Sequence, residues 1–392
     1  MTKLHFRTAR LETPFHPRTS AACETNEWVN WAGYTTVNVY SQVEKEYFAV
    51  RNGTTLFDLS PMIKYRVRGA GATAFFNRLV TRDVTKLKPG RVAYVVWCDD
   101  AGHVLDDGTL FCFAQDDYRL CCQERQLDWL LDSAIGFEVS IEEESEEIAA
   151  LAVQGPTSFS VLTAAGFTGL DSLRPFGIAE SEGITVSRTG FTGDLGYELW
   201  MAPDQAVEVW DRIMAQRGNY DIQPIGSAAL DLVRIEAGFI ATNLDFVSAE
   251  QALRHTRGRS PFELGLGRLV DFEKGHFNGR RALLAERQAG AKYLLVGLDI
   301  EGNKPADGSL VYLRQRKEVG HITSAMWSPT CKRNLALAML RRPYGDSITK
   351  DLWTEIYVLK ELKYDRQMAR CHVVERPFFN PPRRTATPPL PY

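Results

Sequence analysis

Residues 90–122, GRVAYVVWCDDAGHVLDDGTLFCFAQDDYRLCC, decide how the first half of the chain folds. Apolar and β-branched residues dominate RVAYVVWCDD and GTLFCFAQDDYRLCC, which predicts strands joined through a hairpin at AGHVLDD. Asp106 and Asp107 stand side by side in that connection. An Asp–Asp–Gly sequence suits a turn, and no histidine or third acid lies near enough in sequence to favour a metal site. Carboxylates are almost never buried without a partner, so this pair, set between apolar runs, needs an explanation.

The composition is that of a soluble globular protein with two or three domains. The chain has 392 residues, of which 44% are hydrophobic and 24% charged. Its net charge is −3 with no basic block, so we expect no nucleic-acid partner. No apolar run is long enough to span a bilayer and the N-terminus lacks a signal sequence, which predicts a cytoplasmic protein with no membrane partner. Seven cysteines without zinc or disulfide spacing predict free thiols and no metal.

The pattern up to about residue 284 is mixed. Short apolar strands are interspersed with helices without regular alternation, which favours antiparallel sheets with helices on one face, an α+β fold. Amphipathic spacing predicts helices over 73–84, 125–134, 204–218 and 227–238. We therefore expect residues 1–284 to form one region, built from two intertwined α+β subdomains.

The pattern changes near residue 285 to short strands at close spacing, typical of a β-barrel or sandwich. The predicted strands are KYLLVGLDI, SLVYLR, EVGHITSAMW, LALAML and WTEIYVL. We expect a C-terminal barrel domain over 285–375. Residues 376–392 carry six prolines and are predicted to lie along the surface or fray as a Pro-rich tail.

Two glycine-rich stretches each allow a ligand-binding and a structural interpretation. GAGATA, residues 69–74, matches a dinucleotide-binding pattern, but the preceding KYRVRG alternates charged and apolar residues, so a strand-to-helix turn is the better account. RTGFTGDLGYELW, residues 188–200, has a glycine at every third position. It is either a bulged hairpin or a hairpin whose backbone approaches a flat ligand, with the Glu198 carboxylate aimed at that ligand's N–H edge.

One predicted helix carries charges within an apolar sequence. In DLVRIEAGF, Asp231 and Arg234 are three residues apart, and Glu236 follows. An internal charge pair or a solvated face is the expected explanation.

Six segments together resemble the aminomethyltransferase family, the glycine cleavage T-protein and its relatives. In chain order they are EYFAVRNGTTLFDLSPM, GRVAYVVWCDDAGHVLDDGTL, LAVQGP, SRTGFTGDLGYELW, LVRIEAGF and VGHITSAMWSPTCKRNLALAML. The resemblance implies a folate-binding α+β fold with a C-terminal β-barrel. It also implies a one-carbon transferase that binds tetrahydrofolate in a central hole between domains.

The resemblance also assigns site residues. Asp107 matches the family's catalytic aspartate, which faces the reactive nitrogens of the folate. Glu198 would accept N–H bonds from the pterin edge, and Tyr94 would line the pterin pocket. Phe191 stands where the family has a tyrosine, and Gln123 is the nearest match to an asparagine of the site.

Several positions depart from the T-protein pattern. Its ARDxLRLEAG reads ALDLVRIEAG here, so Leu230 replaces an arginine that contacts folate, and its YGNDI reads ATNLDF. These departures favour a demethylase that moves a methyl group from a small S-, N- or O-methylated compound to N5 of tetrahydrofolate. The alternatives are a true T-protein, acting on the aminomethyl-lipoyl arm of a carrier protein, and a non-catalytic folate-binding protein.

Overall fold

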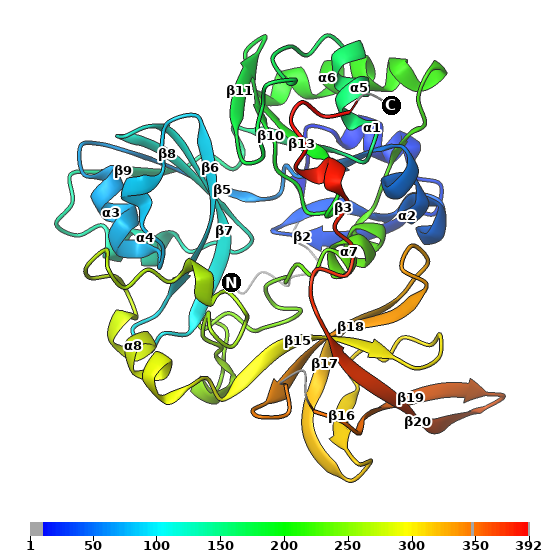
Figure 1. Cartoon of the computed structure of the whole chain (residues 1–392). Helices are drawn as coiled ribbons and strands as arrows, with labels where there is room; N and C mark the ends of the chain where they lie inside the picture. Colours follow the sequence, from blue (N-terminus) through cyan, green and yellow to red (C-terminus); the bar gives the residue numbers. More distant parts are fainter. Residues whose placement is uncertain (1–10, 346–348, 391–392) are drawn as a thin grey trace, which may run out of the picture.

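The computed structural model describes residues 11–345 and 349–390. Within these residues the chain forms three open sheets with helices packed on them and one closed barrel (Figure 1). The predicted α+β class with a C-terminal barrel is confirmed. All seven cysteines lie in the described residues and are free thiols.

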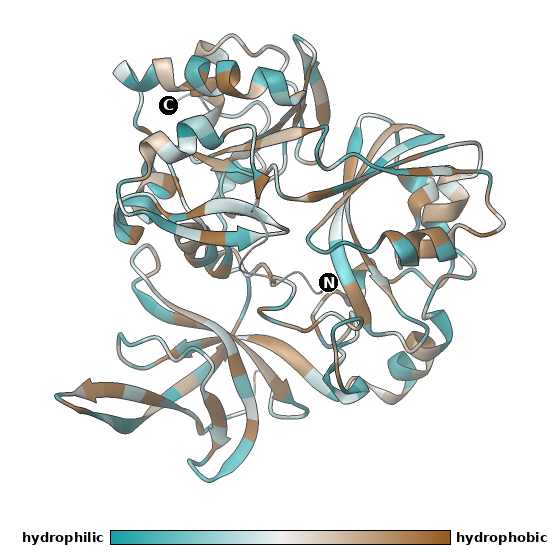
Figure 2. Ribbon diagram, turned by 180° about the vertical axis from the view of Figure 1, so that it is seen from behind, coloured by the Kyte–Doolittle hydropathy of each residue, from teal (hydrophilic) through white to brown (hydrophobic). Residues whose placement is uncertain are grey.

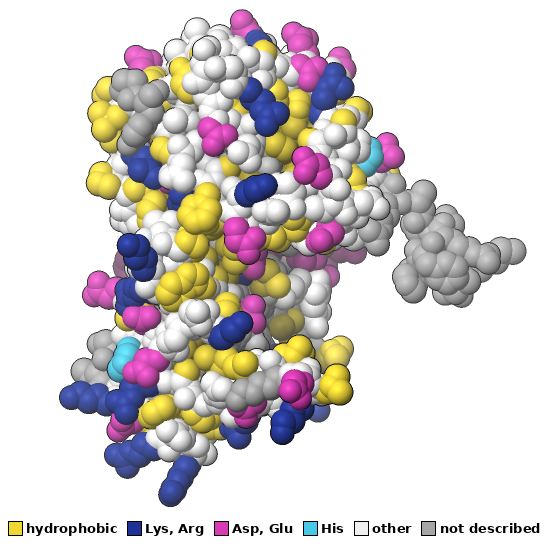
Figure 3. Space-filling model, turned by 90° about the vertical axis from the view of Figure 1, so that its right-hand side faces the viewer, with side chains coloured by type: hydrophobic (Ala, Val, Ile, Leu, Met, Phe, Trp, Pro, Cys, Tyr) yellow, Lys and Arg dark blue, Asp and Glu magenta, His cyan; other side chains and the backbone are white. Residues whose placement is uncertain are grey.

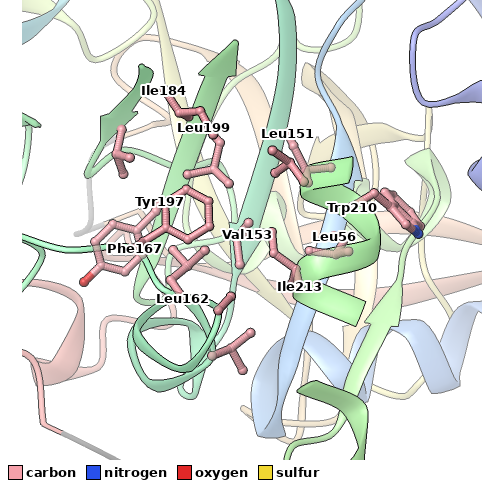
Figure 4. Packing of buried hydrophobic residues seen from close by; sticks show 14 of the residues in the cluster. Leu56, Leu151, Val153, Leu162, Phe167, Ile184, Tyr197, Leu199, Trp210 and Ile213 are labelled. Atoms are coloured by element: carbon pink, nitrogen blue, oxygen red, sulfur yellow. The ribbon is translucent and has the colours of Figure 1, made fainter. Parts of the chain in front are cut away.

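The sheet that carries Glu198 has the strand order β11-β12-β13-β10-β4-β14, antiparallel except for β14, which runs parallel to β4. The spacing of Ala206, Val209, Trp210 and Ile213 gives α6 one apolar stripe, and all four are buried against this sheet (Figure 4). The elements are β4 (Thr54–Asp58), β10 (Ala149–Gln154), α5 (Ser158–Ala164), β11 (Ile178–Ser181), β12 (Ile184–Ser187), β13 (Gly196–Met201), α6 (Ala206–Met214) and β14 (Ile222–Pro224).

The second sheet, of order β6-β7-β8-β5-β9, carries the aspartate pair. Side chains alternate along β6, so Ala93 and Val95 pack under the helices while Tyr94 and Val96 point to the other face. The elements are β5 (Ile63–Arg68), α3 (Ala72–Leu79), β6 (Arg91–Cys98), β7 (Val104–Ala114), β8 (Asp117–Cys122), α4 (Leu127–Ser133) and β9 (Ser140–Glu143). The strand-to-helix turn at GAGATA is confirmed, between β5 and α3.

The hairpin prediction at AGHVLDD needs correction. The turn lies earlier, at Asp99–Gly102, where the Gly102 N–H donates to the Asp99 carbonyl at 3.0 Å and Gly102 has φ +80°. Asp106 and Asp107 belong to strand β7 and pair with β6. The Asp–Asp–Gly motif was read as a turn because its composition suits one, but the register of the two strands places it inside the sheet.

A small sheet of order β1-β3-β2 and three helices complete the first 284 residues. Their bounds are β1 (Leu11–Glu12), α1 (His16–Ala22), β2 (Glu27–Trp31), β3 (Tyr34–Val39), α2 (Val43–Asn52) and α7 (Ser227–Glu236). Helix α7 packs on α2, β3 and two barrel strands. It therefore touches both the N-terminal elements and the barrel.

Helix α7 buries two charged side chains with their partners. Arg234 donates to Asp231 at 2.7 Å and to Ser324 at 2.7 Å, and it forms an ion pair with buried Asp245. The predicted internal charge pair with Asp231 is thus present, but it is one part of a larger network. The network ties α7 to the loop after it and to the barrel.

Glu236 forms the second network. It accepts hydrogen bonds from Tyr47 at 2.6 Å, from Arg51 at 2.6 and 2.9 Å, and from the Ser328 hydroxyl. Tyr47 and Arg51 come from α2 and Ser328 from the barrel. One carboxylate therefore joins three parts of the chain.

The barrel closes in the order β15-β18-β17-β16-β19-β20. The bounds are α8 (Arg280–Ala289), β15 (Tyr293–Ile300), β16 (Leu310–Leu313), β17 (Lys317–Ser328), β18 (Arg333–Arg341), β19 (Leu352–Lys360) and β20 (Lys363–Val374). The sixth strand, β20, was not predicted because its sequence KYDRQMARCHVV lacks an apolar run. With β19 it forms a projecting hairpin whose tip exposes apolar side chains (Figures 1 and 2). The domain boundaries at 284 and 375 stay predictions.

The C-terminal segment, residues 376–390, is docked rather than frayed, which corrects the alternative of a loose tail. The Phe378 and Phe379 N–H groups donate to the Glu236 carbonyl at 3.0 and 2.9 Å. Arg383 forms a two-pronged ion pair with buried Asp194, at 2.6 and 2.8 Å. The segment includes a short 3-10 helix (Pro382–Arg384), and it runs across the first sheet in Figure 1.

Of the helices in the described part of the chain, none has both the length and the apolar character needed to cross a membrane. On the face seen in Figure 3, acidic and basic side chains are scattered among uncharged ones, and several basic side chains gather at its lower end.

We predict that Arg383→Gln destabilises the protein by about 1–3 kcal/mol, because it leaves the buried Asp194 carboxylate without its two-pronged partner. The free energy of unfolding in urea measures this. Arg281→Gln is the matched control, since Arg281 is exposed on α8 and should change stability by less than about 0.5 kcal/mol. Equal stability of the two variants would contradict the role assigned to the segment.

Candidate functional site

Asp106 is fully buried, and donors occupy both of its carboxylate oxygens. Oδ1 accepts the Asp107 N–H at 2.9 Å and the Thr242 hydroxyl at 2.7 Å. Oδ2 accepts the N–H groups of Gln123 and Glu124 at 3.2 and 3.0 Å. Four donors thus converge on this carboxylate, and they hold the turn after β8 and the loop after α7 against β7.

Asp107 is only partly covered and faces the same loop. Its Oδ2 accepts the Tyr94 hydroxyl at 2.6 Å, across the β6–β7 pair, and its Oδ1 lies 3.1 Å from the Thr242 hydroxyl oxygen. The structure therefore brings Tyr94 and Asp107 into direct contact. Their catalytic and folate-binding roles stay predictions.

The two carboxyls influence each other's titration. Burial, and then the neighbouring Asp107 charge, raise the pKa of Asp106 to about 7, and burial also raises the pKa of Asp107. Thr242 lies within hydrogen-bonding distance of both carboxyls and links them.

Thr242 was missed as a site residue. The sequence ATNLDF was noticed only as a departure from the family pattern. Its place depends on Arg234, because the buried pair between Arg234 and Asp245 fixes the loop, and Asp245 also accepts the Ala241 N–H at 3.0 Å. Only long-range contacts place Thr242 beside the aspartates, and no local signal indicates them.

Glu198 lies on β13, buried in the first sheet. Its Oε2 accepts the Thr189 hydroxyl at 2.5 Å and lies 3.5 Å from the Ser187 hydroxyl. Among the described residues no hydrogen bond reaches its Oε1. Burial raises the pKa of Glu198 to about 7, so the carboxyl is partly protonated at neutral pH.

The glycine-rich hairpin around Glu198 has an internal explanation. A Cβ at Gly190 or Gly196 would lie 2.0 or 2.2 Å from the Gln154 side-chain oxygen, so any other residue there would require Gln154 to move. Gln154 itself donates to the carbonyls of Thr189 and Tyr197 at 3.2 and 3.0 Å. These two glycines therefore make room for a buried glutamine, and they are not by themselves a sign of ligand approach.

The remaining predicted residues lie around these two centres. Phe191 is 37% exposed and stacks on Phe239, with ring centroids 5.5 Å apart. The Gln123 side chain is exposed, and only its backbone N–H reaches the aspartate pair. Leu230 is half-buried against the apolar cluster between the two sheets, in which the Phe111 and Trp200 rings lie 5.1 Å apart.

The arrangement combines carboxyls with raised pKa values on two sheets, the aspartate pair on one and Glu198 on the other, with the exposed aromatic ring of Phe191. No three histidine, cysteine or acidic side chains among the described residues are grouped as metal ligands. Carboxyls with raised pKa values can accept N–H bonds from a heterocycle or exchange a proton near neutral pH.

Comparison with known proteins gives consistent matches over nearly the whole chain. Residues 18–274 match the family model of the GCVT N-terminal domain, and residues 294–380 match that of the glycine cleavage T-protein C-terminal barrel domain. An aminomethyltransferase of Bacillus subtilis is 32% identical over 362 residues, covering 90% of this chain and 94% of the relative. One of Halothermothrix orenii is 32% identical over 332 residues, covering 82% and 90%.

A solved structure agrees with this fold. The glycine cleavage system aminomethyltransferase T from Bartonella henselae superposes with a TM-score of 0.83 at 24% identity, over 95% of this chain and 99% of that one.

The prediction of a demethylase for a small methylated compound is wrong. It rested on site departures, chiefly Leu230, whereas the relatives just described are aminomethyltransferases over most of their length. Leu230 packs in the apolar cluster between the sheets, so the change at this position is one of packing and does not by itself indicate a new methyl donor.

We predict a pH-dependent contribution of the aspartate pair to stability. The pair takes up a proton near pH 7 when folded, but an unfolded aspartate does so near pH 4. Its contribution is therefore greatest below about pH 4 and is lost as the pH rises toward 7. In Asp107→Asn the neighbouring negative charge is absent, so the free energy of unfolding should fall less steeply as the pH rises. The slope attributable to one proton, and therefore the change in slope, is at most about 1.4 kcal/mol per pH unit.

Urea unfolding at pH 4 to 8 tests this prediction. Asp100→Asn, in the exposed turn before β7, is the matched control and should keep the wild-type slope. If the free energy of unfolding varies with pH identically in the wild type and in Asp107→Asn, the charge of Asp107 does not affect the titration of Asp106.

Proposed function

The chain belongs to the glycine cleavage T-protein family of aminomethyltransferases, and on this premise we propose that it takes a one-carbon unit from a carrier protein. In this proposal the donor is the aminomethyl group on the lipoyl arm of the carrier, and the acceptor is tetrahydrofolate. The observation that supports the proposal is the contact between two residues to which the family resemblance assigns folate binding: the Tyr94 hydroxyl donates to the Asp107 carboxylate at 2.6 Å.

The residues present fit a folate. The unused Oε1 of buried Glu198 is a ready acceptor for the N–H edge of a pterin, and the exposed Phe191 ring, stacked on Phe239, offers an aromatic contact. Tetrahydrofolate would supply N5 and N10, which take up the methylene carbon while ammonia and the free lipoyl thiol are released.

The chain's own residues have separate tasks. Tyr94 and Thr242 fix the orientation of the Asp107 carboxyl, and burial raises its pKa. Asp107 is thereby suited to hold a proton lost from a ligand nitrogen, or to stabilise positive charge that develops there. Glu198 orients the ligand from the opposite sheet.

The first test is a direct assay. We expect the protein to form 5,10-methylene-tetrahydrofolate and ammonia from tetrahydrofolate and the aminomethyl-loaded carrier protein, measured by mass spectrometry. Asp107→Asn should lower kcat by about 10²–10⁴-fold, because it removes the proton acceptor. Asp100→Asn is the control and should retain activity. If no product forms from the loaded carrier at any folate concentration, the proposed function fails.

The second test uses the titration of Glu198. Since burial raises the pKa of Glu198 to about 7, the ionised form that accepts ligand N–H bonds is lost as the pH falls. The Kd for tetrahydrofolate should therefore rise below pH 7, by up to about tenfold per pH unit. Glu198→Gln should bind more weakly and lose this dependence.

Isothermal titration calorimetry from pH 5.5 to 8 measures both effects, with Asp100→Asn as the control. An unchanged pH dependence in Glu198→Gln would exclude Glu198 as the titrating contact.

A further inference from the structure

The hairpin of β19 and β20 projects beyond the barrel as a two-stranded ribbon (Figures 1 and 2). Strand β19 pairs with β16 only over Leu352–Thr354, and β20 pairs with β15 only over Cys371–Val374. Beyond these residues the two strands pair with each other alone. In the described part of the chain, no strand therefore pairs with the outer edges of residues 355–360 and 363–369.

The ribbon exposes large apolar side chains on one face. Leu359 and Tyr364 lie opposite one another in the register and are 61% and 69% exposed. Tyr357, on the same face of β19, is 53% exposed, and Leu362 in the turn is fully exposed. The other face differs, since Ile356 packs into the apolar cluster of the barrel. A two-stranded hairpin is only marginally stable in water, and a further strand on its edge would stabilise it.

The charges along β20 do not protect its free edge. Charged side chains, lysine above all, often keep edge strands from pairing, because like charges would meet. Residues 361–366 instead carry two acids and two bases, Glu361, Lys363, Asp365 and Arg366. A segment with balanced charges of alternating sign favours neither an acidic nor a basic surface. It is complementary to a second copy of itself.

One antiparallel arrangement matches these charges. When β20 of one copy runs against β20 of a second copy about a two-fold axis at Tyr364, Lys363 of each copy lies opposite Asp365 of the other. The two Tyr364 side chains are neighbours at the axis, and the row formed by Leu359 and Tyr364 continues across four strands. The Asp365 carboxylate accepts the Gln367 amide at 3.2 Å, and its oxygens have lone pairs for a further donor.

The same arrangement keeps the rest of the two molecules apart. Only residues 361–367 of the two copies overlap. Because the paired strands run in opposite directions, the barrel of each copy lies beyond the tip of the other copy's hairpin. The interface is small compared with the about 1,600 Å² that is typical of stable complexes, so the dimer is weak and its Kd lies in the micromolar range.

We propose that two copies of this chain associate through β20, which pairs antiparallel with its own copy about Tyr364 and forms a four-stranded sheet. The free main-chain edge, the exposed apolar row and the self-complementary charges together support this occupant. The proposal does not rest on the proposed function, since none of these residues belongs to the candidate site.

Sedimentation equilibrium of the full chain, at concentrations from about 1 to 300 µM, tests the proposal. The wild type should show a reversible monomer–dimer equilibrium. Lys363→Glu and Asp365→Lys each place like charges opposite one another at both symmetric positions, so each should raise the Kd of the dimer about tenfold or more. Lys350→Glu, the same charge change at an exposed position outside the ribbon, is the matched control and should keep the wild-type Kd.

A rescue experiment distinguishes the register from a general effect of charge. In an equimolar mixture of Lys363→Glu and Asp365→Lys chains, opposite charges again face each other at both positions. The double variant Lys363→Glu/Asp365→Lys restores the same match within one chain. Both samples should dimerise about as tightly as the wild type, which would also show that the single variants are folded.

Each remaining outcome overturns the proposal. A wild type that stays monomeric at every concentration does so, including a monomer that instead cosediments with phosphatidylglycerol vesicles or with the carrier protein through the same hairpin. A dimer that neither single variant weakens uses another surface. Single variants that stay monomeric when mixed, together with a monomeric double variant, exclude the antiparallel pairing about Tyr364.

Discussion

A charged side chain that is removed from water must have partners. Helix α7 buries two charged side chains. Arg234 and Glu236 are almost fully buried, and their partners come from α2, from the barrel and from the loop after α7. Removing one member of such a set leaves the others uncompensated, which is strongly destabilising. These two residues therefore oblige distant parts of the chain to meet at one place, and the sheets, barrel and C-terminal segment are arranged around it.

The same constraint sets the chemistry of the site. Asp106 is tolerated in the interior because four donors surround it. Glu198 accepts fewer hydrogen bonds, and burial raises its pKa to about 7. Burial is the largest cause of the raised pKa at both centres.

The sequence predicted what local patterns can report. The helices over 204–218 and 227–238, the presence of apolar strands within residues 91–122 and five of six barrel strands follow from periodicity. The family resemblance assigned Tyr94 and Asp107, which prove to be in contact. Local sequence patterns could not predict contacts between segments that lie far apart in the chain. Thr242 beside the aspartates, Gln154 beneath two glycines and the docking of the C-terminal segment are all of this kind. The demethylase prediction failed for a related reason, since Leu230 was judged as a ligand contact without knowledge of its packing.

The docking of the C-terminal segment has a consequence for biosynthesis. Its partners, Arg188 and Asp194, flank the hairpin that carries Phe191, and they are made nearly 200 residues before Arg383, which pairs with Asp194. During translation the hairpin cannot complete its contacts until the C-terminal segment has been synthesised. A nascent chain that stops before residue 376 leaves the buried Asp194 without its main counter-ion. Ribosomes would thus complete the contacts of this hairpin only with a nearly complete polypeptide, and prematurely terminated products would carry a buried carboxylate without its main partner.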